Sequence, residues 1–215
     1  MVVYFEKESN FRLAAAGLGG ENRLLIKNTI KTLAEFWNFG GKMSGRPVIY
    51  MSRCFGFEKC RYDGKDFFCE FAENLKKHAE IIHWCPETAI GLGCPREKIR
   101  VVKIDGKNLL FQPETGKFFT EKMIETSNNY LKTLGNIDGF FLKAKSPSCG
   151  VKNTKLYRGK SDELISTDAS GFFALQVMKL FPNVPVLTEE DLKDEAKTKD
   201  FLEKVFGETV SVKLK

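Results

Sequence analysis

Three short apolar runs in this chain of 215 residues are each followed by a cysteine. The runs are VIYMS, EIIHW and FFL, and the cysteines after them are Cys54, Cys85 and Cys149. Gly or Pro follows each cysteine within two residues, which keeps these loops from continuing as helix. If the three runs are parallel strands of one sheet, their carboxyl ends lie at one edge, and the three thiols converge there.

Segments with helical spacing alternate with the apolar runs. We predict helices over 66–80, 120–134 and 168–181. We also predict a last helix that ends near Gly207, with Thr188 as its N-cap residue and Asp191, three residues later, as the second residue of the capping pair. The run IRVVKI (99–104) and the segment NLLFQ flank an Asp-Gly turn, which is typical of a hairpin. This alternation predicts an α/β layered fold with a mostly parallel central sheet and the cysteines in loops at the strand carboxyl ends.

The length is consistent with one domain plus an appendage, at about 150 residues per domain. Residues 21–38 have apolar side chains at helical spacing before Gly40-Gly41, so we expect an N-terminal helical extension over 1–45 and a single domain over 46–215. No apolar run approaches the roughly 18 residues of a membrane-spanning helix, and the start lacks a signal-peptide pattern. We therefore expect a cytoplasmic protein without a membrane partner.

The chain carries 34 basic and 28 acidic side chains, a net charge of +6. This excess permits polyanionic partners without requiring them. Residues 143–160 contain six basic side chains and no acidic one. Such a run is either a solvated face or a phosphate-binding track beside a site.

The donor set favours an iron–sulfur cluster over zinc. The chain has only two histidines and no CxxC pair, and tetrahedral zinc would need a fourth ligand besides Cys54, Cys85 and Cys149. Three thiolates on a four-iron cluster leave one iron open, and an open iron is a Lewis acid that binds sulfur well. Of the other cysteines, Cys60 is either a ligand, a support for the loop or a spare thiol, whereas Cys69 and Cys94 fit structural positions.

Two further side chains stand out by their positions. Glu87 lies two residues after Cys85, where it can act as a general base or proton donor in the same cleft, or be a surface carboxylate. Ser146 lies three residues before Cys149, where its hydroxyl can contact substrate or simply form a Ser-Pro turn.

Several motifs occur in one order along the chain. They are SRCFGFEKCRYDGK (52–65), HWCPETAIGLGCPRE (83–97), TGKFFTEKM (115–123) and LKAKSPSCG (142–150). On these segments residues 47–206 resemble the thiouracil desulfurase family. The later part of the chain is more similar to tRNA thiouridine desulfidases, whose second, C-terminal domain we do not expect here.

The resemblance implies a cofactor, a reaction and site residues. It implies a [4Fe–4S] cluster held by Cys54, Cys85 and Cys149, with one iron not bound by protein, and catalytic roles for Glu87 and Ser146. In the segment LKAKSPSCG (142–150) we also predict that Ser148 and Lys145 bind substrate. The implied reaction is a non-redox desulfuration, in which the thiocarbonyl sulfur binds the open iron, water activated by Glu87 attacks the carbon, and the oxo base and sulfide are formed.

Our leading hypothesis is therefore a desulfidase for a thiolated pyrimidine, as a base, a nucleoside or within tRNA. One alternative is a non-catalytic iron–sulfur or redox-sensing protein that binds RNA through its basic face. Another is a zinc protein that uses Cys54, Cys60, Cys85 and Cys149. The sequence assigns no oligomeric state.

Overall fold

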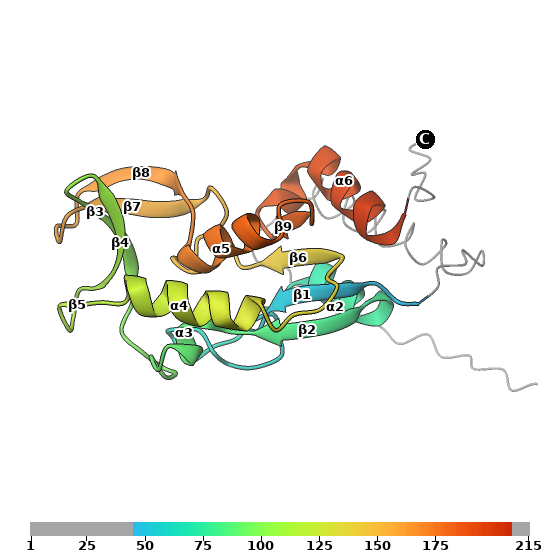
Figure 1. The fold of residues 1–215 in the computed structure, drawn as a ribbon, viewed down its shortest axis with the longest axis horizontal. Helices are drawn as coiled ribbons and strands as arrows, with labels where there is room; N and C mark the ends of the chain where they lie inside the picture. The colour runs from blue at the N-terminus through green and yellow to red at the C-terminus, as the bar shows by residue number, and fades with distance from the viewer. Residues whose placement is uncertain (1–44, 208–215) are drawn as a thin grey trace, which may run out of the picture.

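The computed structural model describes residues 45–207, which form two β-sheets and the helices that cover them. Figure 1 shows the two sheets in different halves of the molecule, with α4 (Thr120–Leu131) extending from one sheet to the other. The helix predicted over 21–38, and all but residue 45 of the predicted extension, lie outside the described residues. Within 45–207, no helix is both long enough and apolar enough to cross a membrane.

The first sheet has four strands, all parallel, in the order β2-β1-β6-β9. Its strands are β1 (Val48–Ser52), β2 (Glu80–Trp84), β6 (Gly139–Leu142) and β9 (Val186–Thr188). The predicted strands at VIYMS, EIIHW and FFL are thus confirmed, and they are direct neighbours. Strands β1 and β6 are apolar along almost their whole length because both faces of this sheet are covered.

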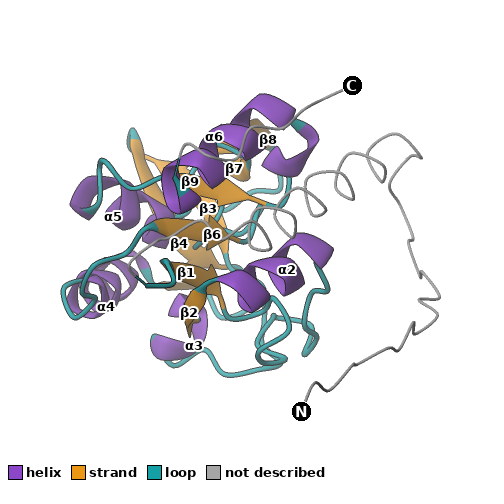
Figure 2. Cartoon of the chain, turned by 90° about the vertical axis from the view of Figure 1, so that its right-hand side faces the viewer, coloured by secondary structure: helices purple, strands orange, loops and turns teal. Residues whose placement is uncertain are grey.

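Successive side chains of β1 and β6 enter different cores. On one face, Ile49, Met51 and Phe141 pack with residues of α2 (Glu70–His78) and α6 (Glu195–Phe206). On the other face, Tyr50 and Phe140 pack with residues of α4 and α5 (Phe172–Leu180). Figure 2 shows these two helix pairs on opposite sides of the strands. The period-2 alternation of a strand accounts for this division.

The second sheet has five strands in the order β5-β4-β3-β7-β8, with mixed directions. They are β3 (Arg100–Ile104), β4 (Lys107–Gln112), β5 (Lys117–Phe118), β7 (Thr154–Arg158) and β8 (Leu164–Ala169). The predicted hairpin of β3 and β4 is confirmed. Strands β7 and β8 were not predicted. Strand β7 lies within the basic run 143–160. Strand β8 covers residues 168 and 169, which were predicted as helix, so α5 begins only at Phe172.

The helix boundaries otherwise follow the predictions with local differences. The helix predicted over 66–80 begins only at Glu70, with Cys69 as its N-cap residue. The predicted cap at Thr188 is wrong, because Thr188 ends β9 and its hydroxyl donates to Asp191 at the start of a 3₁₀ turn, η1 (Asp191–Lys193). Asp194 caps α6 instead, accepting a hydrogen bond from the Lys197 amide. Gly207 ends α6 as predicted. The α/β class with a parallel central sheet is confirmed.

Candidate functional site

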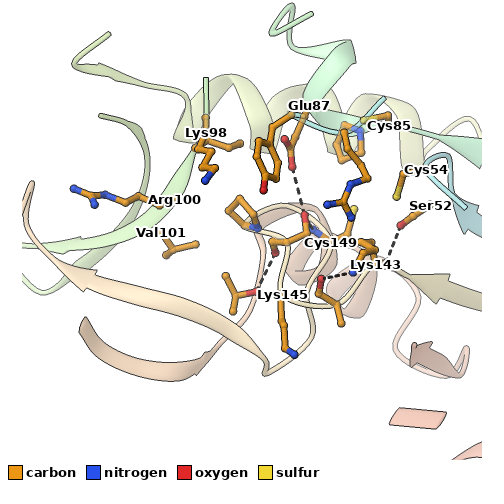
Figure 3. Close-up of a pocket in the computed structure, with 18 of the residues that line it drawn as sticks. Ser52, Cys54, Cys85, Glu87, Lys98, Arg100, Val101, Lys143, Lys145 and Cys149 are labelled. Atoms are coloured by element: carbon orange, nitrogen blue, oxygen red, sulfur yellow. Dashed lines mark hydrogen bonds between the residues drawn. The ribbon is translucent and has the colours of Figure 1, made fainter. Parts of the chain in front are cut away.

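The cysteine-bearing loops converge at the carboxyl edge of the parallel sheet. Strands β2, β1 and β6 lie side by side in one direction, with Ser52 paired to Trp84 and Met51 to Phe141. The residues after these strand ends, including Cys54, Cys85 and Cys149, line one cavity of about 520 Å³. Figure 3 shows these three cysteines together on one side of it. This volume is in the range of small-molecule sites.

A fourth thiol lies at this edge. Cys54, Cys60 and Cys85 form one buried group, with 8%, 1% and 9% of their surfaces exposed. The loop after β1 is closed by a 2.7 Å hydrogen bond from the Phe67 amide to the Cys54 carbonyl, which brings Cys60 back under the strand ends. The cavity is therefore bordered by four cysteines rather than the three predicted to be ligands.

Cys149 reaches the cavity through a tight loop, although it lies seven residues beyond β6. The Ser146 hydroxyl accepts hydrogen bonds from the amides of Ser148 (3.2 Å) and Cys149 (3.1 Å). Gly150 has no room for a side chain, since a Cβ there would lie 2.2 Å from Thr154 Oγ1. A Cβ on Gly171 would lie 2.3 Å from the Ser148 carbonyl carbon, so the start of α5 packs directly on this loop. Two glycines and one hydroxyl thus fix the Cys149 position.

The protein alone disfavours negative charge at three of these thiols, Cys60, Cys85 and Cys149. A hydrogen bond to Cys54 and burial raise the pKa of Cys60 to about 12. The pKa of Cys85 is raised through its hydrogen bond to Cys60 and by burial, and burial raises the pKa of Cys149 well above its usual range. Thiols of this kind become thiolate ligands when a metal centre supplies the positive charge. Soft, converging thiols around a cavity fit an iron–sulfur cluster.

A single metal ion has no such ready site. Among residues 45–207, no three His, Cys, Asp or Glu side chains are grouped closely enough to hold one ion. A cluster of several irons and sulfides needs ligands around a larger volume, which the four cysteines border. The zinc alternative therefore gains no support from the described residues.

Glu87 is held in a defined orientation beside the thiols. It lies in α3 (Pro86–Ala89), which starts directly after Cys85. Its Oε2 accepts from Arg96 Nε (3.0 Å) and Nη2 (2.5 Å), and its Oε1 accepts from Ser148 Oγ (2.7 Å). Ser146 Oγ lies 3.4 Å from the same Oε1. The carboxylate thus lines the cavity with both oxygens fixed.

Arg96 was not among the predicted site residues. Its side chain is 5% exposed, and besides Glu87 it donates through Nη1 to the carbonyls of Cys60 and Gly93, both at 2.9 Å. One guanidinium therefore fixes the Glu87 carboxylate and the loop that carries Cys60. The CPRE segment contained the residue, but nothing in its spacing showed that it would return to Glu87.

The two predicted substrate-binding residues lie in different settings. Ser148 is fully buried, and its hydroxyl is committed to Glu87. Lys145 lines the cavity, but its side chain is 65% exposed and its Nζ pairs with Glu190 at 3.0 Å. Their roles toward substrate stay predictions.

The remaining cysteines differ from these four. Cys69 packs against the core between the parallel sheet and α2, where burial raises its pKa to about 11. Cys94 is exposed, and its Sγ lies 2.6 Å from the Lys59 carbonyl oxygen. Neither residue lines the cavity.

The wall of the cavity away from the cysteines comes from the second sheet and is basic. Figure 3 shows Lys98 and Arg100 on that side, across from Cys85 and Cys149. Of the described residues that line the cavity, eight are basic and only Glu87 is acidic. The basic residues are Arg53, Arg61, Arg96, Lys98, Arg100, Lys143, Lys145 and Lys155. Six of them form ion pairs, whereas Lys98 and Lys155 pair with no acidic residue in the described part of the chain.

Comparisons with known proteins show a family and a related fold. A family model described as 2-thiouracil desulfurase matches residues 49–190, more than half of the chain. The uncharacterized protein YbbK of Bacillus subtilis (strain 168) is 30% identical over 112 residues, which cover 48% of this chain and 73% of YbbK. The solved structure of the [4Fe-4S]-dependent thiouracil desulfidase TudS superposes with a TM-score of 0.56 at 23% identity, covering 72% of this chain and 99% of TudS. The TudS likeness extends the agreement to the fold.

Proposed function

Because this chain belongs to the 2-thiouracil desulfurase family, we propose that it removes sulfur from a thiolated pyrimidine and leaves the oxo base and sulfide. The observation that carries this proposal is a partly buried carboxylate, Glu87, fixed beside converging thiols at one cavity. The solved structure that shares the fold is of a [4Fe-4S]-dependent thiouracil desulfidase, which supports the same cofactor here.

Cys54, Cys85 and Cys149 would hold the cluster, since each follows one of three adjacent parallel strands. When bound, the cluster supplies a Lewis-acidic iron that polarises a carbon–sulfur double bond. The protein supplies the buried setting, in which such electrostatic interactions are stronger than in water. Reactant and water are held in the cavity that the thiols and Glu87 share.

Glu87 would take a proton from water as the water attacks the thiocarbonyl carbon. A general base must lie within hydrogen-bond reach of the water, and Glu87 lines the cavity. Ser146 also lines it, so its hydroxyl would contact substrate or pass on a proton to Glu87 Oε1, 3.4 Å away. Ser148 would act through Glu87, because its hydroxyl already donates to that carboxylate.

The positive charge of the cavity wall favours a substrate that carries phosphate over a free base. Such a substrate is a thiolated nucleotide or an RNA. A neutral base has no need of a basic wall, whereas phosphate is recognised by Lys and Arg. Lys98 and Lys155 have no acidic partner among residues 45–207 and line the cavity on the second-sheet side. Lys145 would assist at the rim.

A Glu87→Gln variant tests the catalytic proposal. The amide keeps the size of the side chain but cannot accept a proton, so we expect turnover of thiouracil or thiouridine to fall about 100-fold or more. The assay follows loss of the thiocarbonyl absorbance and release of sulfide under anaerobic conditions, with iron content measured on every sample.

Glu121→Gln is the matched control, because Glu121 is an exposed carboxylate on α4 that does not line the cavity. We expect it to retain full activity. Unchanged turnover in a cluster-bearing Glu87→Gln protein would remove the catalytic role of Glu87. A cluster-bearing wild-type protein without turnover of either substrate would favour a non-catalytic iron–sulfur protein that binds RNA.

A further inference from the structure

Cys60 has surroundings unlike those of a packing cysteine. A free cysteine inside a protein normally acts as a small apolar side chain among other apolar side chains, as the partly buried Cys69 does here. Cys60 is 1% exposed, yet its buried neighbours are the thiols of Cys54 and Cys85, and it lines the cavity. Its position among sulfur ligands therefore needs a reason other than packing.

The backbone holds Cys60 in that position. Its carbonyl accepts a 2.9 Å hydrogen bond from Arg96 Nη1, and its amide donates to the Glu58 carbonyl at 2.8 Å. The same Arg96 fixes Glu87, so the loop with Cys60 and the proposed base are linked through one side chain. A spare thiol would not need this support.

We propose that Cys60 is a fourth cysteine ligand of the same cluster, an inference that rests on the proposed function. When substrate is absent, Cys60 would bind the iron that Cys54, Cys85 and Cys149 leave open. The four thiols border one cavity. Cys54, Cys85 and Cys149 follow neighbouring strands of the parallel sheet. Cys60 instead lies in the middle of the long loop between β1 and α2. It is thus the one of the four that does not follow a strand of the parallel sheet, so its side chain can release the iron without a change in the strands.

This assignment has a consequence for substrate binding. Cys60 would release the iron as the substrate sulfur binds: one iron–thiolate bond would break, one iron–sulfur bond would form, the released thiolate would take up a proton from solvent, and no electron would be transferred. Until then the thiolate protects an iron that would otherwise be exposed to water and oxidants. Cys60 would thereby slow the loss of this iron from the cluster when no substrate is bound.

The test compares anaerobically reconstituted wild-type protein with Cys60→Val and Cys60→Ser. The readout is loss of one iron on limited ferricyanide oxidation, followed as iron per chain and as the electron paramagnetic resonance signal of a three-iron cluster. Cys69→Ala is the control, because Cys69 is a partly buried cysteine outside the cavity. Circular dichroism checks the fold, and the serine variant carries the comparison if the valine variant does not fold.

If Cys60 is a ligand, both Cys60 variants give several-fold more three-iron signal than wild type and Cys69→Ala. Equal signals in all four proteins, each with a full cluster, would overturn the Cys60 assignment and leave the desulfidase proposal intact. A wild-type protein that binds no iron and sulfide would overturn both.

Discussion

The two sheets of this molecule contribute different chemistry to one cavity. The parallel sheet is covered on both faces by helices, and its strand ends present thiols and, one turn on, Glu87. The mixed sheet contributes Lys98, Arg100 and Lys155 from β3, β7 and the residues before β3. On the parallel-sheet side the three thiols after the strands are at most 9% exposed and Glu87 is fixed by hydrogen bonds, whereas Lys98 and Lys155 are exposed and have no acidic partner among the described residues.

This difference suggests a division of labour. Buried, fixed groups suit the cofactor and the proton transfer, where small displacements are costly. Exposed cations suit recognition of a charged substrate, where affinity depends on salt. Changes on the parallel-sheet side should therefore lower kcat or empty the cofactor site, while changes on the mixed-sheet side should raise KM.

The largest effect is expected for Arg96→Ala. Removing one partner of a buried ion pair leaves an uncompensated charge, so we expect a loss of about 3–5 kcal/mol in the free energy of unfolding, with a large fall in kcat. Arg96→Lys keeps the charge but loses the two-point contact with Glu87. We therefore expect the lysine variant to regain stability but only part of kcat. Urea denaturation and steady-state kinetics measure both.

The mixed sheet offers a matched control in Arg158→Ala. Arg158 also pairs with a glutamate, Glu163, but the two side chains are 65% and 58% exposed. Such surface pairs contribute about 0–1 kcal/mol, so stability and kcat should stay close to wild type. Equal losses in the two arginine variants would contradict the distinction between the two sheets.

An intermediate effect is expected for Gly171→Ala. The added Cβ would meet the Ser148 backbone, and overpacking of this kind costs about 1–3 kcal/mol. The displaced loop carries Cys149, so iron content or kcat should fall as well. Gly135→Ala is the control, because nothing lies within 4 Å of a Cβ there. A Gly171→Ala protein with normal stability, iron content and kcat would show that the loop is not fixed as described.

The Cys149 loop also shows how far the sequence predicts this site. Cys54 and Cys85 follow their strands within two residues, so strand periodicity alone placed them. Cys149 lies seven residues past β6, and its return depends on contacts with Thr154 and Gly171 that no local pattern contains. Cys149 lies at the sheet edge as predicted, but tertiary contacts place it there rather than the end of its strand.

Other features depended even more on tertiary structure. Arg96 lies nine positions after Glu87, beyond the end of α3, and a sequence gives no direction for such a loop side chain. Strand β7 has only Thr154 and Leu156 as fully buried residues, so its alternation was hidden within a basic run. Strand β8 is mostly exposed and lacks an apolar face. The parallel sheet was predictable because burial on both faces marks its strands clearly.

The smallest effect is expected for the double variant Lys98→Ala, Lys155→Ala. Both lysines are exposed, so stability should change by no more than about 0.5 kcal/mol. KM for thiouridine monophosphate should rise, and the rise should shrink at high salt, while kinetics with thiouracil stay unchanged. Lys103→Ala, an exposed lysine of β3 outside the cavity, is the control. A double variant with equal KM changes for both substrates would remove the proposed phosphate preference.

The central claim is that the carboxyl edge of the parallel sheet holds an iron–sulfur cluster. The most direct measurement is the iron and sulfide content, with the visible spectrum, of anaerobically purified wild-type protein and of Cys149→Ala. We predict about four irons and four sulfides per wild-type chain, with a broad iron–sulfur absorption band, and a clear loss of both in the variant. Absence of iron and sulfide from the wild-type protein after anaerobic reconstitution would contradict the claim.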